Sequence, residues 1–251
     1  MNAWARHESS KETISCLAQL VVQGGEVAII ELTREGEVFV LRMNDGENRF
    51  RDDSVAAWNA ALDEVERAEG PKALVTTGAG KFYSNGLDLE WALRERKDSF
   101  PDYILSVLAV LGRVLTLPCT TVAACNGHAF GAGAQLLVSQ DYRLMRADRG
   151  FFCMPEVDMR VPLHPGMTAL LAARLPGRTV HEVLATGRRY GGADARAAGI
   201  VEEALPEAEL LPRALALAAP LAAKAHPVMK QIKSDLYPHV LAALRQKLEP
   251  A

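Results

Sequence analysis

The sequence predicts an α/β fold in which a mostly parallel sheet is followed by a helical C-terminal region. Short segments rich in Val, Ile, Thr and Phe alternate with longer stretches of helical periodicity, and strands that alternate with helices usually pair in parallel. The strand signals stop after about Pro162. Beyond Pro206 the chain is rich in Ala and Leu up to Lys247, and four prolines are expected to break this region into separate helices: Pro212, Pro220, Pro227 and Pro238.

Each element has its own local signal. The expected strands are Val27–Leu32, Glu37–Met43, Ala73–Thr77, Thr120–Ala124 and Asp141–Arg146. One long helix is capped by Asp52 and Asp53 and ends near Gly70, and another opens at Pro101, where proline suits a first helical turn. Shorter helices are expected at Met167–Leu175, Val180–Thr186 and Asp194–Ala198.

Composition narrows the class of protein. The chain has 251 residues, of which 49% are hydrophobic and 24% are charged, enough for a sizeable core. Its net charge of −3 and scattered Lys and Arg argue against nucleic acid as a partner. No stretch is long enough to cross a membrane. The four cysteines lack CxxC spacing, which favours reduced thiols in a cytosolic protein over disulfides or a metal site. We expect an extension over residues 1–25, a core over 26–205 and a helical region over 206–251.

A first motif, CNGHAFGAGAQLL (Cys125–Leu137), places small residues where a strand is expected to feed a helix. The first turn of a helix leaves backbone N–H groups unpaired, and a turn without bulky side chains gives a ligand oxygen access to them. Close packing of helix on strand explains the same composition, and the motif alone leaves both explanations open. The GxGxxG and GxxxxGK[ST] spacings of nucleotide sites are absent from it.

Two further motifs fit the first one. In GKFYSNGLDLEW, Gly86 again lies in a polar turn after a strand, so two such turns side by side could present one N–H each to an oxyanion. In RGFFCMPEVDM, Glu156 stands among apolar residues, where loss of water raises the pKa of a carboxyl group and suits it to general acid–base work. A plain βα loop and a solvated glutamate are the alternatives when each motif is taken alone.

Together the three motifs resemble those of the crotonase (enoyl-CoA hydratase/isomerase) superfamily from about Val27 to the C-terminus, and the runs FYSNGLDLEWA and SQDYRLMRADRGFFCMPEVDM are similar to plant-type Δ3,Δ2-enoyl-CoA isomerases. The resemblance implies a crotonase-like spiral of ββα turns with a C-terminal helical trimerisation region. It implies an acyl-CoA substrate, no cofactor besides the coenzyme A of the substrate itself, and a homotrimer or dimer of trimers.

The resemblance also assigns roles. The N–H groups of Leu87 and Ala132 would form an oxyanion hole, with Ser84, Asn85 and Gly86 in the same substrate-binding segment, and Glu156 would move the proton. The family's hydratases use two glutamates, and here the first position is Gln135, which cannot ionise. A single carboxylate suits transfer of a double bond from C3 to C2. Alternatives are another crotonase-type enzyme (hydratase, thioesterase or decarboxylase) or a non-catalytic acyl-CoA-binding trimer.

Three positions depart from the family pattern or lie outside it. Arg160 replaces a common glycine and could pair with Glu156, which would lower the pKa of that carboxyl group. Ala132 replaces another glycine but keeps the N–H. His128 lies in the first motif, beside the expected site, where packing explains it as well as chemistry does. The peroxisomal address typical of the plant branch is missing, so we expect a cytoplasmic protein. We also expect no metal ion in the site.

Overall fold

The computed structural model describes residues 28–247, and the expected extension over residues 1–25 lies outside them. The main sheet has six strands in the order β1-β2-β3-β5-β7-β9. Only the pairing of β1 with β2 is antiparallel within it. The strands are β1 (Ile30–Glu35), β2 (Val38–Met43), β3 (Ala73–Gly78), β5 (Thr120–Cys125), β7 (Tyr142–Arg146) and β9 (Glu203–Leu205).

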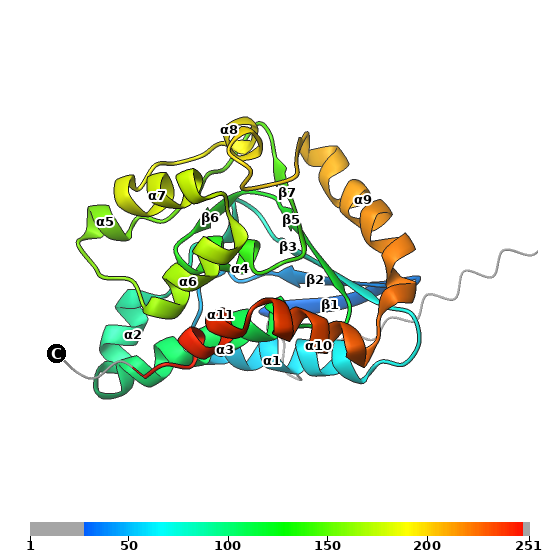
Figure 1. Ribbon diagram of the computed structural model, residues 1–251, viewed down its shortest axis with the longest axis horizontal. Helices are drawn as coiled ribbons and strands as arrows, with labels where there is room; N and C mark the ends of the chain where they lie inside the picture. Colours follow the sequence, from blue (N-terminus) through cyan, green and yellow to red (C-terminus); the bar gives the residue numbers. More distant parts are fainter. Residues whose placement is uncertain (1–27, 248–251) are drawn as a thin grey trace, which may run out of the picture.

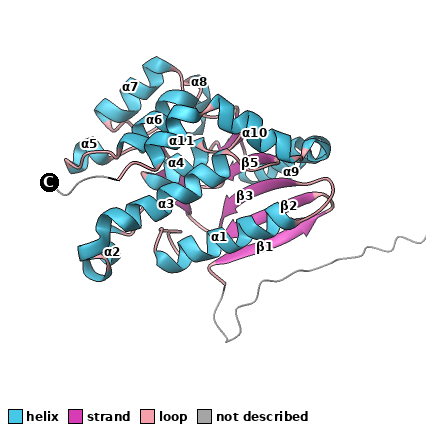
Figure 2. Ribbon diagram, turned by 60° about the horizontal axis from the view of Figure 1, so that its bottom comes forward, coloured by secondary structure: helices cyan, strands magenta, loops and turns pink. Residues whose placement is uncertain are grey.

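Helices cover both faces of this sheet (Figures 1 and 2). Helix α9 (Glu207–Ala218) packs Leu210, Ala214 and Ala218 on one face, in a cluster with Val75 and Val122. The opposite face is covered by a larger cluster that includes α1 (Asp52–Arg67), α3 (Phe100–Leu115) and α4 (Ala132–Val138). Because both faces are buried, β3 and β5 consist wholly of buried residues, as is usual for parallel strands.

A second, three-stranded parallel sheet lies beside the main one. It has the order β4-β6-β8, with β4 (Phe82–Ser84), β6 (His128–Phe130) and β8 (Phe152–Cys153). Each of its strands ends immediately before one of the three sequence motifs' turns. Because the strands are parallel, all three turns emerge at the same edge of this sheet, and this edge positions the candidate site.

The remaining helices follow the sheets or pack around their edges. They are α2 (Leu89–Glu95), α5 (Glu156–Met159), α6 (Pro165–Arg174), α7 (Gly177–Thr186), α8 (Gly192–Ala197), α10 (Pro227–Leu236) and α11 (Pro238–Leu244), with 3₁₀ turns at Lys97–Ser99 and Ala219–Lys224. The buried Lys233 ammonium fastens α10 to the core, because it donates to Asp141 at 2.7 Å and to the carbonyl of Cys119 at 2.8 Å.

The predicted mixture of a parallel sheet with C-terminal helices is confirmed, with three local corrections. Strand β9 follows Pro162, where we expected no further strand, and it pairs with β7. The three short strands of the second sheet were not predicted, because two or three residues are too few to show a period. Pro212 lies inside α9 and does not break it, since the helix is held against the sheet by its buried face.

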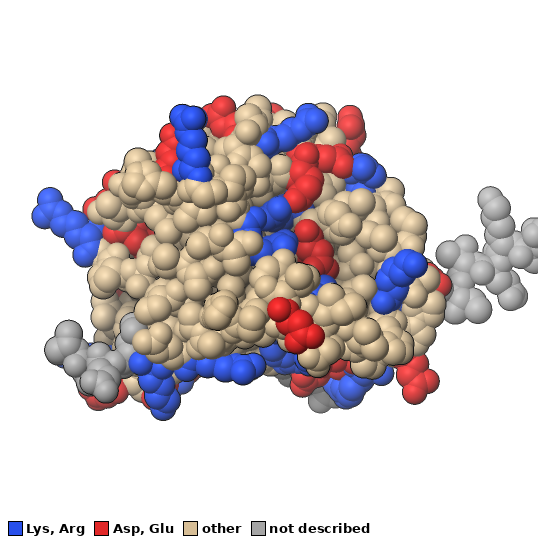
Figure 3. Space-filling view, viewed as in Figure 1, with Lys and Arg blue, Asp and Glu red and all other residues tan. Residues whose placement is uncertain are grey.

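Three cysteines, Cys119, Cys125 and Cys153, are free and buried, as expected for reduced thiols. Cys16 falls outside the described residues. Over residues 28–247, no helix combines the length and hydrophobicity that a bilayer crossing requires. In the same range, no three His, Cys, Asp or Glu side chains are grouped so as to hold a metal ion. On the face shown in Figure 3, the Lys and Arg side chains interleave with Asp and Glu.

Candidate active site

A cavity of about 530 Å³ opens where the three motif turns meet. Leu87, Ala132 and Glu156, each from a different motif, all line it. The other walls are mainly apolar and come from β6, α2, α3, α5, α6 and the loop between α5 and α6: Leu89, Phe100, Ile104, Phe130, Met159, Val161, Pro162, Leu163 and Met167. An apolar cavity with a few convergent polar groups is the usual form of a small-molecule site.

The N–H of Leu87, a residue of the cavity wall, is left unpaired by the hydrogen bonds of its neighbours. Phe50 N–H donates to the carbonyl of Gly86 at 2.8 Å, and Asp88 N–H donates to the carbonyl of Phe50 at 3.1 Å. These two bonds form a parallel bridge between Phe50 and Leu87. In such a bridge the N–H of the central residue faces away from the partner strand. Within residues 28–247 the N–H of Leu87 has no acceptor, so it is free to bind a ligand oxygen.

The N–H of Ala132 is free for a different reason. Ala132 is the first residue of α4, and the first N–H groups of a helix have no acceptor within the helix. No other acceptor is provided by the described part of the chain. Gly131 precedes it at φ 51° and ψ −119°, a conformation that only glycine adopts readily. This turn therefore leaves an unpaired donor at the N-terminus of α4, the positive end of the helix dipole.

Close packing explains the small residues of the first motif, and the unpaired N–H of Ala132 is compatible with the second explanation, access of a ligand oxygen. A β-carbon added at Gly133 would lie 2.2 Å from the carbonyl oxygen of Ser84, so there is no room for a side chain there. The second motif therefore packs directly on α4. Likewise, a β-carbon at Gly86 would lie 2.6 Å from the carbonyl oxygen of Phe130 and 3.0 Å from the nitrogen of Ala132. Close packing brings the two turns together, and Leu87 and Ala132, whose N–H groups are unpaired, both line the cavity.

Glu156 begins α5 and carries the carboxyl group of the cavity. A β-carbon at Gly131 would lie 3.3 Å from Glu156 Oε1, so the carboxyl group rests against the turn of the first motif. Its Oε2 atom is buried and has no hydrogen-bond partner in the described structure. Burial raises the pKa of Glu156, and the residue's own backbone N–H offsets part of this rise. The direction predicted for its pKa is thus confirmed, and a carboxyl group turned fully to solvent is ruled out.

The remaining substrate-binding candidates have unequal positions. Asn85 lines the cavity, and its side chain donates to Glu47 at 2.7 Å. Ser84 is fully buried beneath the turn, where its hydroxyl donates to the carbonyl of Asn48 at 2.7 Å and accepts from Gly86 N–H at 3.2 Å. Its position suits holding the turn, and the structure does not bring its side chain into the cavity wall.

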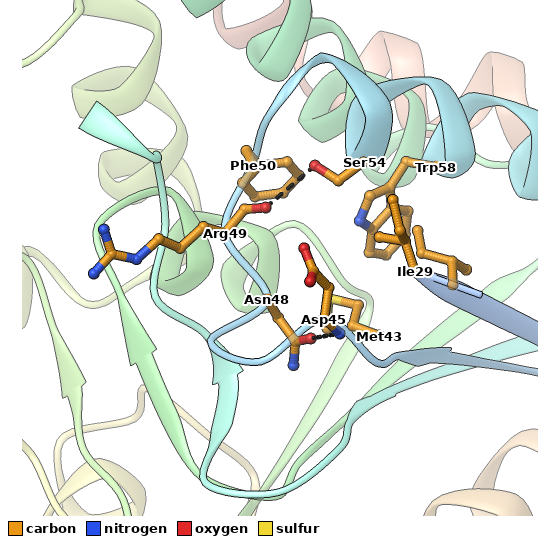
Figure 4. A pocket seen from close by; sticks show the side chains of 9 residues that line it. Ile29, Met43, Asp45, Asn48, Arg49, Phe50, Ser54 and Trp58 are labelled. Carbon is orange, nitrogen blue, oxygen red and sulfur yellow. Dashed lines mark hydrogen bonds between the residues drawn. The ribbon is translucent and has the colours of Figure 1, made fainter. Parts of the chain in front are cut away.

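Asn48 fastens the neighbouring loop to the second motif. Its side-chain nitrogen donates to the carbonyls of Phe82 and Tyr83, and its oxygen accepts from Asp45 N–H at 2.9 Å (Figure 4). The cavity seen in Figure 4 measures only about 10 Å³, room for no more than one water molecule. The Arg49 side chain points away from that small cavity, and Arg49 belongs to the wall of the large one.

Gln135 lies one helical turn beyond Ala132 and is completely buried. Neither its amide oxygen nor its amide nitrogen has a partner in the described residues. Gln135 is not part of the wall of the large cavity. The position therefore offers no ionisable group to the candidate site.

His128 is packed among aromatic rings, and Arg160 is not paired with Glu156. The His128 ring packs among Phe82, Phe130 and Phe151, with centroid distances of 5.2, 5.0 and 5.7 Å. Burial, with the positive charges around it, lowers the pKa of His128. Arg160 is exposed and forms no ion pair with Glu156 within residues 28–247. The lowering of the Glu156 pKa that such a pair would cause is therefore absent.

Two polar residues of the wall, Arg49 and His164, were not predicted. Arg49 lies near the Gly86 turn only because Phe50 pairs with Leu87, a contact across 37 positions. His164 caps α6 by accepting from Gly166 N–H at 3.0 Å, and its other ring nitrogen bonds the carbonyl of Gln246 at 2.9 Å. A His-Pro pair before a helical run is a capping signal that could have located His164.

The family model for enoyl-CoA hydratase/isomerase matches residues 33–250. The chain belongs to this family. Among relatives, enoyl-CoA delta isomerase 3 of Arabidopsis thaliana is 34% identical over 83% of this chain and 92% of its own length. Enoyl-CoA delta isomerase 2, peroxisomal, of the same plant is 34% identical over 85% of this chain and 94% of its own.

A crystal structure described as a probable enoyl-CoA hydratase from Mycobacterium tuberculosis has the same fold, with a TM-score of 0.80 and 26% identity. The match covers 87% of this chain and 92% of that one. The expected superfamily and its crotonase fold are thus confirmed. Because enoyl-CoA hydratase/isomerase family members carry names of both activities, the family alone does not choose between double-bond transfer and hydration.

Proposed function

We propose that this member of the enoyl-CoA hydratase/isomerase family moves a double bond from C3 to C2 of an enoyl-CoA thioester. The observation that carries the proposal is that the cavity holds one carboxyl group, Glu156, while the position of the second hydratase acid is the buried amide of Gln135. Hydration needs an acid and a base acting on a water molecule. Double-bond transfer needs one group that takes a proton and returns it.

In the proposed reaction, the thioester oxygen accepts hydrogen bonds from the N–H groups of Leu87 and Ala132. The Glu156 carboxylate takes a proton from C2, and the electron pair of that C–H bond moves into the conjugated system. The resulting dienolate carries its negative charge largely on the thioester oxygen, where the two N–H groups stabilise it. Glu156 then returns the proton to C4, which leaves the double bond between C2 and C3.

The raised pKa of Glu156 supports this role, because a stronger base is better matched to a weakly acidic carbon. No cofactor is required, since the base and the backbone donors supply the whole reaction and coenzyme A enters as part of the substrate. We propose a cytoplasmic enzyme on the basis of its buried free thiols.

The proposal extends to assembly as a homotrimer or a dimer of trimers. Helix α10 supports it, because Val228, Ile232 and Leu236 recur every four residues and are each more than half exposed. An apolar stripe of this kind is typical of a protein interface. Measuring the molar mass in solution for the native chain and for Ile232→Glu tests this part, and a monomeric native chain would contradict it.

The deciding experiment compares the native enzyme with Glu156→Gln on 3-enoyl-CoA and 2-enoyl-CoA substrates. The variant is nearly isosteric, so we expect it to bind acyl-CoA while losing double-bond transfer by about 10²-fold or more. Normal turnover by the variant would remove Glu156 from the mechanism. Efficient hydration of 2-enoyl-CoA by the native enzyme would assign it to the hydratases instead. Affinity for acyl-CoA without turnover would indicate a non-catalytic binding protein.

A further inference from the structure

The helix that begins at Glu156 ends in a strained residue. Arg160 follows α5 with φ 56° and ψ 37°, in the left-handed region. In the described part of the chain, Asn48 is the only other residue besides glycine with a positive φ. Asparagine adopts this conformation readily, whereas arginine does so against steric resistance from its β-carbon. Such strain persists only where the surrounding structure imposes it.

Two hydrogen bonds show what the left-handed residue accomplishes. Arg160 N–H donates to the carbonyl of Val157 at 3.3 Å, and Val161 N–H donates to the carbonyl of Glu156 at 3.0 Å. This pair of bonds is a Schellman motif with Arg160 as its left-handed residue. Because α5 has only four residues, the motif closes directly on the main chain of Glu156.

The carboxyl group of Glu156 depends on that main chain for its direction. Its Oε2 atom has no partner in residues 28–247, so no neighbouring side chain fixes it there by a hydrogen bond. The same turn sets Met159 and Val161, which flank Arg160 and line the cavity. The outer side of α5 rests on Gly187, where a β-carbon would lie 3.3 Å from Val157 Cγ1.

The side chain of Arg160 takes no part in these contacts. It is exposed, and its guanidinium group has no hydrogen bond or ion pair to any residue from 28 to 247. We propose that Arg160 is a positioning residue whose left-handed backbone, and not its charge, directs the Glu156 carboxylate and the Met159–Val161 wall toward the substrate. This inference rests on the role proposed for Glu156.

Three substitutions separate backbone conformation from charge. Arg160→Gly removes the charge and makes the left-handed conformation easy. Arg160→Val removes the same charge but makes that conformation harder, because the residue is β-branched. Arg160→Lys keeps the charge with similar backbone preferences. We expect kcat/KM for 3-enoyl-CoA to fall about tenfold in Arg160→Val and to stay within about threefold of the native value in the other two.

Two readouts distinguish positioning from general damage. If α5 opens in Arg160→Val, Glu156 gains water, so the acid limb of its pH profile should move to lower pH. The limb should stay in place in Arg160→Gly. Amide hydrogen exchange at Val161, whose N–H is bonded to Glu156, should quicken in the valine variant alone. Thermal unfolding of each variant verifies that the whole chain remains folded.

The proposal is overturned if Arg160→Gly loses as much activity as Arg160→Val, because the charge would then matter. It is also overturned if Arg160→Val retains native activity, or if the Val161 amide exchanges at the same rate in all variants. The exchange measurement does not depend on turnover. If Glu156→Gln proved fully active, the proposed function would fail, while amide exchange would still decide whether Arg160 holds α5 closed.

Discussion

The free N–H of Ala132 can be deleted with little disturbance to the fold, which gives a direct test of the oxyanion hole. Ala132 occupies the first position of α4, where proline is well tolerated because the N–H is unpaired. A residue before proline is restricted to extended conformations. Gly131, at φ 51° and ψ −119°, has the mirror image of such a conformation, which an achiral residue can keep. Ala132→Pro therefore fits the existing turn.

The expected loss follows from the number of donors. The proposed oxyanion hole has two donors, the unpaired N–H groups of Leu87 and Ala132, and Ala132→Pro removes one. Deleting one oxyanion donor typically lowers kcat by about 10²–10³-fold, or about 2.7–4 kcal/mol. No hydrogen bond of the folded chain is lost, so the free energy of unfolding should change by about 1 kcal/mol or less.

The assay follows formation of the conjugated 2-enoyl thioester from 3-enoyl-CoA, alongside thermal unfolding. Ala132→Gly is the matched control, because it keeps the N–H and costs about 1 kcal/mol in helix propensity. We expect its kcat to stay within a few-fold of the native value. If Ala132→Pro were folded and its kcat lay within about fivefold of the native value, the donor at Ala132 would have no role in catalysis.

Three further predictions concern the acid. The native kcat/KM should rise with pH as Glu156 ionises, with an apparent pKa above that of an ordinary glutamate; a profile flat between about pH 4 and pH 8 would contradict this. Because the pKa of Glu156 is raised in the folded state, ionisation of its carboxyl group lowers the free energy of unfolding as pH rises through that pKa. We therefore expect Glu156→Gln to be more stable than the native chain by about 1 kcal/mol at neutral pH and by less in acid, as measured by chemical denaturation. Gln135→Glu should retain double-bond transfer while losing about 2–4 kcal/mol of stability, since the site is fully buried; unchanged stability would show that the new carboxyl group finds a partner or water.

Much of the framework could be predicted from local sequence, because its signals are local. The helix at Asp52–Arg67 buries Trp58, Leu62 and Val65, whose spacing of four and three residues is a local helical signal. The parallel pairing of β3 with β5 likewise follows from the alternation of strands and helices. The second sheet was missed because its strands have two or three residues each, too few for any periodicity.

The site was predicted in part for the same physical reason. Glycine turns and an apolar setting around Glu156 are visible in single motifs, and the pKa direction of Glu156 follows from them. The roles assigned to Leu87 and Ala132 stay predictions, although both line the cavity. The place of Arg49 depends on the contact of Phe50 with the distant Leu87, which no local pattern encodes, whereas His164 carries a local capping signal that was not used. The left-handed backbone of Arg160 was not predicted either, because arginine rarely adopts a positive φ.

The convergence of β4, β6 and β8 at one edge has a consequence for how such a protein can change over generations. In the proposed mechanism two of the three turns act through the main-chain N–H groups of Leu87 and Ala132, which every amino acid but proline supplies, so a change of side chain at either position leaves the donor in place. The third turn offers a side chain, which a single codon change can replace. A descendant can thus acquire new chemistry by altering one loop while it inherits the other two intact.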